Sequence, residues 1–321
     1  MDWFTYQNGR LFCEQTAATD LAEQFGTPLY VYSAQTFRHH YDLITKAFGP
    51  LDPLICYSIK SCGNVHILRL LAERGAGMDV VSGGELFRAL EAGVPPEKIV
   101  YAGVGKTDEE IDESLRAGIG LFNIESEAEF ENIAQRAEAA GTTAHGALRI
   151  NPDVADERTH AKTTTGKKET KFGVDIERAR IFFATYGDHP HLKLTAVHLH
   201  IGSPIYSAEP YVRAIEKTLG LIEQLRQAGH TIDTIDIGGG YAADYESGLS
   251  PAPGLYAERI VPLLKDRGLK VILEPGRFIA GNAGILLSRV QYVKTGGAKR
   301  FAIMDSGMHH LVRPAMYEAF H

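Results

Sequence analysis

From residue 54 onward, short apolar runs alternate with longer amphipathic stretches. The apolar runs predict eight β-strands, at 54–60, 77–82, 98–103, 120–126, 145–151, 193–202, 234–240 and 270–276. Between them, apolar positions recur every three or four residues, as in VHILRLLAERGAG and GGELFRALEAGV, which predicts helices that end near glycine. Apolar strands that alternate with helices form parallel βαβ units. We therefore predict an α/β fold with a (β/α)₈ TIM barrel, and an open doubly wound sheet is the alternative.

Two segments lie outside this repeating pattern. Residues 1–36 contain the strand-like runs LFCE and GTPLYVYS, and residues 284–321 contain ILLSRVQYVKTG and KRFAIMDSG. We interpret them as halves of one small, incomplete β domain, and residues 37–283 as the barrel. The longest polar excursion, 151–175, follows the fifth predicted strand, at the end where barrels carry functional loops.

Composition narrows the class of protein. The chain has 321 residues, 44% of them hydrophobic, and a formal net charge of −7, whereas nucleic-acid-binding proteins usually have a basic face. No run of apolar residues is long enough for a membrane span, and MDWFTYQNGR lacks the layout of a secretory signal. The three cysteines have neither disulfide-framework nor zinc-site spacing. We expect a cytoplasmic protein that acts on a small molecule.

Charged residues and glycines follow several of the predicted strands. Lys60 ends the first strand, His200 lies in the sixth, Gly238–Gly240 end the seventh, and Glu274 and Arg277 lie at the end of the eighth. A single lysine at a strand end is usually a solvated side chain with a buried stem. Because the carboxyl ends of barrel strands meet at one rim, these residues together predict one site.

Three chemistries compete for this site. GGGYAA at 238–243 matches a dinucleotide-binding pattern, but it follows the seventh strand, where barrels bind phosphate through backbone N–H groups. His198 and His200 are both histidines, a residue type that often binds metal ions. Carboxylate and cysteine partners are not nearby in sequence, so we predict no metal. Pyridoxal phosphate requires a Schiff-base lysine, a phosphate cradle and a partner for its pyridine nitrogen, and this set of residues offers all three.

The chain also resembles the fold-type III pyridoxal-phosphate decarboxylases, and among them the diaminopimelate decarboxylases. The resemblance covers nearly the whole chain and is carried by YSIKSCGN, MDVVSGGELFRALEAGVPPEKIVYAGVGKT, FNIESEAE, HLHIGS, DIGGGY, EPGRF and DSGMHHLVRPAMYEAFH. It implies an alanine-racemase-like barrel, pyridoxal 5'-phosphate as cofactor, and a homodimer with active sites at its interface. The implied reaction converts meso-2,6-diaminopimelate to L-lysine and CO₂.

The resemblance further implies a role for each matching residue. Lys60 is expected to form the Schiff base, His200 to stack on the cofactor ring, and Glu274 to pair with the pyridine nitrogen; these three are the expected catalytic residues. The expected cofactor contacts are Lys60, Asp79, Arg149, His200, Ser203, Gly238, Gly239, Gly240, Glu274, Gly276 and Arg277, and the expected substrate contacts are Arg277, Arg313 and Tyr317.

The chain departs from the family pattern in three places. Ser61-Cys62 replaces the usual Ala-Asn, and His309-His310 replaces an asparagine–acid pair before Arg313. These changes leave open a related decarboxylase that acts on another amino acid, carboxynorspermidine, or a carrier-bound or siderophore intermediate. The family also continues beyond a segment like Tyr317–His321 to a Cys-Glu-Ser-x-Asp motif whose cysteine donates a proton across the dimer interface. None of the three cysteines matches it, so either the record of the sequence is shortened or the protein itself is. In the second case we expect a shortened homologue that binds the cofactor with weak or absent turnover.

Two further alternatives belong to other classes. A non-catalytic pyridoxal-phosphate carrier of the same fold type would lack a second domain and the Arg-Pro-Ala-x-Tyr segment that begins at Arg313. A fold-type III racemase would lack the HIGS motif that begins at His200.

Overall fold

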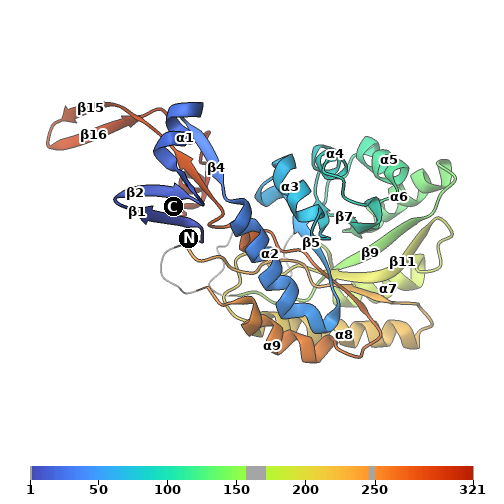
Figure 1. The fold of residues 1–321 in the computed structure, drawn as a ribbon. Helices are drawn as coiled ribbons and strands as arrows, with labels where there is room; N and C mark the ends of the chain where they lie inside the picture. The colour runs from blue at the N-terminus through green and yellow to red at the C-terminus, as the bar shows by residue number, and fades with distance from the viewer. Residues whose placement is uncertain (1, 157–170, 246–249, 321) are drawn as a thin grey trace. The chain divides into compact units, whose positions relative to one another are not determined.

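A computed structural model describes residues 2–156, 171–245 and 250–320 (Figure 1). Most of the polar excursion predicted after the fifth strand, residues 157–170, lies outside the described residues. The chain divides into two compact units. The barrel unit comprises His40–Ala242 and Ser250–Ile279, and the terminal unit comprises Met1–His39, Ala243–Leu249 and Ala280–His321.

The barrel unit is built on eight parallel strands that close on themselves. Each strand pairs with the next one along the chain, β9 pairs with both β8 and β11, and β13 pairs back with β5. This closure confirms the predicted barrel and excludes the open sheet. A short ninth strand, β10 (Val174–Asp175), pairs with the end of β9. The barrel strands are β5 (Leu54–Ser58), β6 (Gly77–Val80), β7 (Ile99–Tyr101), β8 (Leu121–Ile124), β9 (Ala144–Asn151), β11 (Leu192–Leu199), β12 (Thr234–Asp236) and β13 (Lys270–Leu273).

Most of the barrel strands end earlier than the hydrophobic pattern predicts. β5 ends at Ser58, and Lys60 lies in the 3₁₀ turn η2 (Ile59–Ser61) that follows it. β12 ends before Gly238, whose φ of +67° leaves the extended conformation. Lys60, His200, the glycine turn and Glu274 therefore lie beyond the strand ends, outside the hydrogen-bonded ladder, whereas Asp79 and Arg149 lie within β6 and β9.

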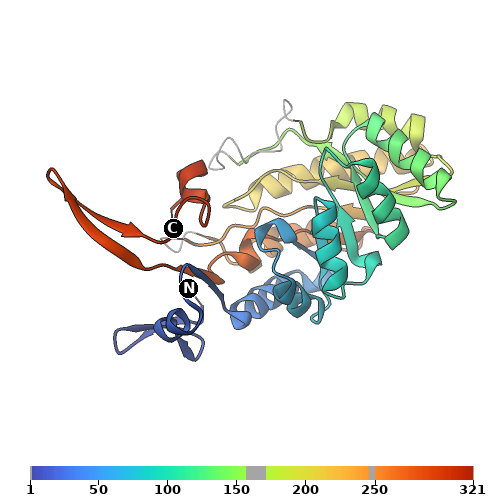
Figure 2. The same cartoon turned by 90° about the horizontal axis from the view of Figure 1, so that it is seen from above.

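Helices lie outside the strands, as the view from above shows (Figure 2). Serine and threonine begin several of them: the Ser82, Thr107 and Ser126 side chains each accept a backbone N–H bond from the first turn. α5 ends at Gly118 in the left-handed conformation, as its Ala-Gly ending predicts. The helices associated with the barrel are α2 (Ala34–Phe48), η1 (Gly49–Leu51), α3 (Val65–Ala72), α4 (Gly83–Glu91), η3 (Pro96–Lys98), α5 (Asp108–Ala117), α6 (Glu127–Ala139), α7 (Ile176–Tyr186), α8 (Glu209–Gln227), α9 (Pro253–Leu264) and α10 (Arg277–Ala280).

The inside of the barrel changes from apolar to polar toward the carboxyl ends of the strands. Alternate strand residues point to the same face, so a residue two positions further along a strand lies one layer higher. One layer is a buried apolar cluster of Cys56, Val100, Leu121, Ala147, Ala196 and Ile272. Two residues beyond five of these lie Ser58, Asn123, Arg149, His198 and Glu274, all of them buried.

The terminal unit is made of antiparallel strands from both ends of the chain. β4 (Leu29–Tyr32) pairs with β14 (Gly284–Leu287), and this pairing joins the two segments. A hairpin of β15 (Val290–Gly296) and β16 (Lys299–Met304) has every residue exposed. The remaining elements are β1 (Phe4–Gln7), β2 (Arg10–Cys13), β3 (Thr16–Ala17), α1 (Ala18–Phe25) and α11 (Arg313–Tyr317).

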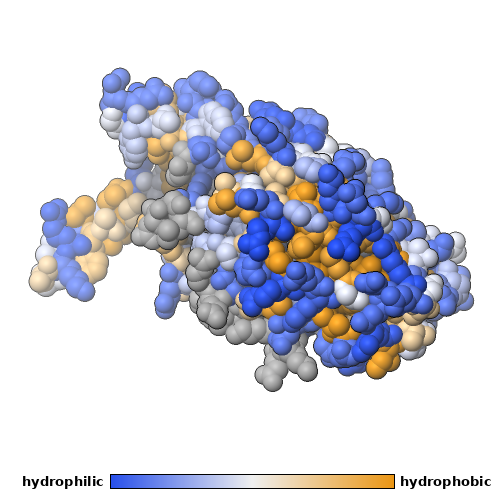
Figure 3. All heavy atoms as spheres, turned by 90° about the horizontal axis from the view of Figure 1, so that it is seen from below, coloured by the Kyte–Doolittle hydropathy of each residue, from blue (hydrophilic) through white to orange (hydrophobic). Residues whose placement is uncertain are grey.

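The surface mixes polar and apolar residues. On the face drawn in Figure 3, polar residues cover much of the barrel unit, and apolar residues are exposed between them. Among the described helices, none is both long and apolar enough to cross a membrane.

Gly77 provides a test of how closely the barrel is packed. A Cβ added at Gly77, in β6, would lie 2.2 Å from the Lys98 carbonyl oxygen and 2.9 Å from the Cys56 Sγ. We expect Gly77→Ala to lower the free energy of unfolding by about 2 kcal/mol, since backbone atoms must shift.

Gly84→Ala is the matched control, because nothing lies within 4 Å of a Cβ at this position in α4. Alanine there is expected to be neutral or to stabilise by up to about 1 kcal/mol. Urea unfolding of both variants measures the difference; equal effects would contradict the packing described for β6.

Candidate active site at the barrel mouth

Lys60 and Asp79 form an ion pair across the first two barrel strands. Ser58 and Asp79 are register partners on β5 and β6. The Asp79 Oδ2 accepts a bond from the Ser58 Oγ at 2.5 Å and from the Lys60 Nζ at 2.8 Å. Burial lowers the pKa of Lys60, but Asp79 and Glu274 raise it more, so the net shift is upward. About half of the lysine side chain, 54%, remains exposed at the mouth.

Glu274 follows the last barrel strand and is buried among hydrogen-bond donors. Its Oε1 accepts from the Asn123 Nδ2 at 3.0 Å, and its Oε2 lies 3.3 Å from the His198 Nε2. Burial raises the pKa of Glu274, but His198 and Lys60 lower it by more, so the pKa falls well below its ordinary value. Glu274 is therefore a buried carboxylate that keeps its negative charge.

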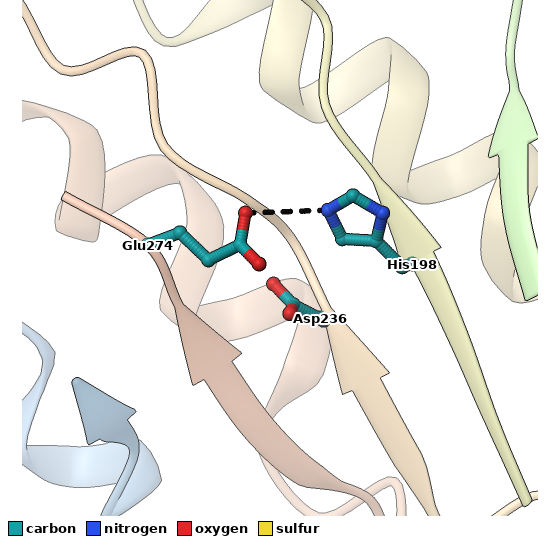
Figure 4. A group of neighbouring side chains, drawn as sticks. All are labelled: His198, Asp236 and Glu274. Carbon is teal, nitrogen blue, oxygen red and sulfur yellow. Dashed lines mark hydrogen bonds and ion pairs between the residues drawn. The ribbon is translucent and has the colours of Figure 1, made fainter. Parts of the chain in front are cut away.

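Asp236 lies beside Glu274, at the end of β12 (Figure 4). Its Oδ1 accepts a bond from the Gly238 N–H at 2.9 Å. One oxygen or nitrogen from each of His198, Asp236 and Glu274 lies within 4.8 Å of the other two. His200, which the sequence pairs with His198 as a possible ligand, is not part of this group. Its Nδ1 accepts a bond from the Gly239 N–H at 3.2 Å.

The glycine turn after β12 leaves no room for side chains. A Cβ at Gly239 would lie 2.1 Å from the Glu274 carbonyl oxygen, and one at Gly240 would lie 2.4 Å from the Gly202 carbonyl oxygen. Gly238 and Gly240 both have positive φ, at +67° and +110°. Among the described residues, no hydrogen bond is made by the Gly240 N–H, although this glycine is buried. Such a bare, buried N–H suits an anionic ligand.

Ser203 and the turn after β13 complete this side of the rim. The Arg277 Nε donates to the Ser203 Oγ at 3.0 Å. A Cβ at Gly276 would lie 2.3 Å from the Ser61 Oγ, so the turn after β13 packs against the turn that carries Lys60. The Glu274 N–H donates to the Gly238 carbonyl oxygen at 2.9 Å. The lysine turn and the glycine turn are thereby joined through β13 at the same mouth.

Arg149 forms a buried ion pair next to this rim. Its Nη1 donates to the Glu125 Oε1 at 2.8 Å, and the other oxygen of Glu125 accepts from the Gly173 N–H at 2.9 Å. Arg149 also affects His200: burial and then the arginine charge lower the pKa of His200 from 6.5 to about 3. His200 is therefore a neutral imidazole near pH 7.

Most of the predicted site residues belong to the barrel unit. There the hydrogen bonds and close approaches described above connect Lys60 and Asp79 to Glu274, the glycine turn, Ser203 and Arg277. Arg313 and Tyr317, the other predicted substrate contacts, lie in α11 of the terminal unit, where the Arg313 guanidinium lies 4.8 Å from the centre of the Tyr245 ring. Their contact with substrate stays a prediction.

Three polar residues of the site are not predicted from the sequence. Ser58, Asn123 and Asp236 each contribute a hydrogen bond at the mouth. The available signal was strand periodicity, because Ser58 and Asn123 lie two residues beyond inward-facing apolar positions. Asp236, on β12, is the register partner of His198 on β11, so it lies in the same polar layer.

The residues present fit pyridoxal phosphate. The glycine turn offers bare backbone at a place where any side chain would clash, which suits a phosphate. An amine and an ionised carboxylate lie on the same rim, as a Schiff base and a pyridine nitrogen require.

Comparison with known proteins agrees with this chemistry. Residues 34–281 match the family model for the pyridoxal binding domain of pyridoxal-dependent decarboxylases. Over 320 residues, 99% of this chain and 76% of the relative, the chain is 45% identical to a diaminopimelate decarboxylase of Aquifex aeolicus. It is 43% identical to that of Haemophilus influenzae, covering all of this chain and 77% of the relative.

Solved structures show the same fold. A diaminopimelate decarboxylase from M. jannaschii superposes with a TM-score of 0.93 at 36% identity, covering 100% of this chain and 77% of that one. The Helicobacter pylori enzyme, complexed with L-lysine, has a TM-score of 0.90 at 37% identity, covering 94% and 76%. The chain belongs to the family of pyridoxal-dependent amino-acid decarboxylases.

Proposed function

We propose that this protein converts meso-2,6-diaminopimelate to L-lysine and CO₂ with pyridoxal phosphate bound at the barrel mouth. The observation that carries the proposal is the set of contacts that joins Lys60, Glu274 and the glycine turn on one rim. The identity of 45% to a diaminopimelate decarboxylase supports the choice of substrate.

Lys60 and Asp79 supply the covalent anchor of the proposed site. When bound, pyridoxal phosphate supplies an aldehyde for amines and a conjugated ring that accepts the electron pair left by CO₂. Lys60 is the amine that would hold this group, and Asp79 holds the lysine nitrogen in place by their 2.8 Å contact. The Gly238–Gly240 turn, Ser203 and the backbone at Gly276 would hold the phosphate.

Glu274 is suited to keep a positive charge on a pyridine nitrogen. A carboxylate with a lowered pKa stays ionised and favours the protonated form of a basic neighbour. Asn123 and His198 fix the orientation of the carboxylate from two other strands. This is the role expected of the acid partner in a pyridoxal-phosphate site.

Neutral His200 is suited to pack against an aromatic ring without adding a charge. Its pKa of about 3 keeps the imidazole neutral throughout the working range of most enzymes. The bond from the Gly239 N–H to its Nδ1 fixes both the ring orientation and the tautomer, with the proton on Nε2.

The arginines indicate a substrate with two carboxylates. A guanidinium group binds a carboxylate through two parallel hydrogen bonds, and Arg277 and Arg313 are the candidates. Two related structures, from H. pylori and M. jannaschii, are complexed with L-lysine. The adjacent rings of His309 and His310, 3.9 Å apart, keep a related decarboxylase with another substrate as the second candidate.

We also infer that the protein is a cytoplasmic homodimer with active sites at the interface. The three cysteines, Cys13, Cys56 and Cys62, are free thiols, as a reducing compartment favours. Sedimentation velocity tests the dimer, and a monomer at micromolar concentration would contradict it.

The central experiment combines a spectrum with a substrate panel. The chain purified with pyridoxal phosphate is expected to show the visible absorbance band of the lysine-bound cofactor, and Lys60→Ala to lose it. Lys46→Ala, an exposed lysine in α2, is the control that keeps the band.

Diaminopimelate is expected to change this band and release CO₂ more than lysine, ornithine or arginine does. Greater CO₂ release from a different amino acid than from diaminopimelate would contradict the proposed substrate. Absence of the band of the lysine-bound cofactor in the wild-type chain would contradict the proposed function itself.

Arg313→Lys tests whether the Arg313 guanidinium binds a carboxylate of the substrate. Lysine keeps the positive charge but loses the two parallel hydrogen bonds, so we expect the KM for diaminopimelate to rise about tenfold. An unchanged KM would show that Arg313 does not bind substrate. Arg289→Lys, an exposed arginine between β14 and β15, is the control.

The pKa of His200 predicts how stability depends on pH. Its pKa falls from 6.5 to about 3 in the folded chain, so below about pH 6.5 only the unfolded chain binds this proton. The folded state therefore loses stability as pH falls through this window. We expect His200→Gln to lose less stability between about pH 7.5 and about pH 5.5 (about one unit either side of an ordinary histidine pKa), as measured by urea unfolding. Equal losses in both proteins would show that His200 titrates normally.

A further inference from the structure

Two carboxyl groups lie side by side in the interior of the barrel mouth. Asp236 is fully buried and Glu274 is 5% exposed. Their carboxyl groups point toward each other in Figure 4, and an oxygen of each lies within 4.8 Å of the other. Two carboxylates this close and this deeply buried cannot both carry a negative charge without a large energetic cost. One proton must therefore be held by the pair.

The hydrogen-bond donors decide which group holds the proton. Glu274 has a side-chain donor at each oxygen, namely Asn123 at Oε1 and His198 at Oε2. Asp236 has one donor, the Gly238 N–H, at Oδ1. Among the described residues, no donor reaches its Oδ2, which is buried. Donors stabilise the charged form, so the charge belongs on Glu274 and the proton on Asp236.

The surrounding charges agree with this assignment. Lys60, after β5, and His198, on β11, both favour a charge on Glu274. Asp79, on β6, and Glu274, after β13, act on Asp236 through their carboxyl groups, which oppose a second negative charge. Burial, followed by Glu274, raises the pKa of Asp236 well above its ordinary value.

We propose that Asp236 is a neutral carboxylic acid that donates a hydrogen bond from Oδ2 to Glu274 while its Oδ1 accepts one from Gly238. Asp236 is then a positioning residue that links the acid of the pyridine site to the glycine turn of the phosphate site. Its effect on the cofactor rests on the proposed function, whereas its protonation does not.

Infrared spectroscopy of the cofactor-free chain tests the protonation directly. A protonated carboxyl group has a C=O stretch that a carboxylate lacks and that shifts in D₂O. The difference spectrum between the wild-type chain and Asp236→Asn at pH 7.5 is expected to contain this band. Its absence, with carboxylate bands in its place, would overturn the proposal.

Two substitutions test the positioning role. Asparagine resembles a protonated aspartate, because its Nδ2 donates and its Oδ1 accepts. Asp236→Asn is therefore expected to keep the Kd for pyridoxal phosphate within about threefold of wild type, whereas Asp236→Leu, which does neither, should raise it about tenfold. If asparagine weakens binding as much as leucine does, the positioning role is wrong. Where the leucine variant fails to fold, the infrared band and the asparagine variant still decide.

Two controls separate the possible failures. Asp79→Asn removes a carboxylate that is ion-paired with Lys60, so its difference spectrum should show carboxylate bands and no protonated carboxyl band. A metal ion bound among His198, Asp236 and Glu274 would displace the proton, so stoichiometric metal in the purified chain would also overturn the proposal. If the wild-type chain binds no pyridoxal phosphate, the proposed function fails while the infrared result stands.

Discussion

The site depends on a geometric constraint of the closed barrel: alternate residues of every strand point to the same side. An apolar layer that includes Cys56 and Ile272 fills the interior. The next layer toward the carboxyl ends begins two residues further along, with Ser58 and Glu274. Its polar groups are surrounded by protein, so they must satisfy one another across the barrel. The register of the strands thus determines which hydrogen bonds are available.

This constraint explains why the polar side chains at the barrel mouth form hydrogen bonds and ion pairs with one another. Asp79 accepts bonds from Ser58 and Lys60. Glu274 takes its donors from β8, across the barrel, and from β11, two strands away. A buried charge without a partner costs several kcal/mol, so each of these groups depends on residues distant in sequence. The polar layer is therefore sensitive to single substitutions.

The sequence predicts the barrel and the types of residue on its rim, but not how they are paired. Strand and helix periodicity is local, and therefore all eight strands and the glycine helix endings could be predicted. Residues with recognised chemistry, such as Lys60 and Glu274, stand out at strand ends. Asn123 and Asp236 do not, because their roles follow from cross-strand register, which a single sequence does not reveal. The short strands β1, β3 and β10 were missed because two to four residues carry too little pattern.

Closure of the barrel between β5 and β13 has a consequence for biosynthesis. Only two residue pairs, Ile272 with Leu54 and Leu273 with Ile55, form the register of this seam. Lys60 lies just beyond one side of the seam and Glu274 just beyond the other. A nascent chain that has emerged from the ribosome without its eighth strand therefore has Lys60 and Asp79 but lacks Glu274. A ligand that contacts both Lys60 and Glu274 binds only the chain whose barrel is closed. By mass action it therefore stabilises the pairing of the first and last strands.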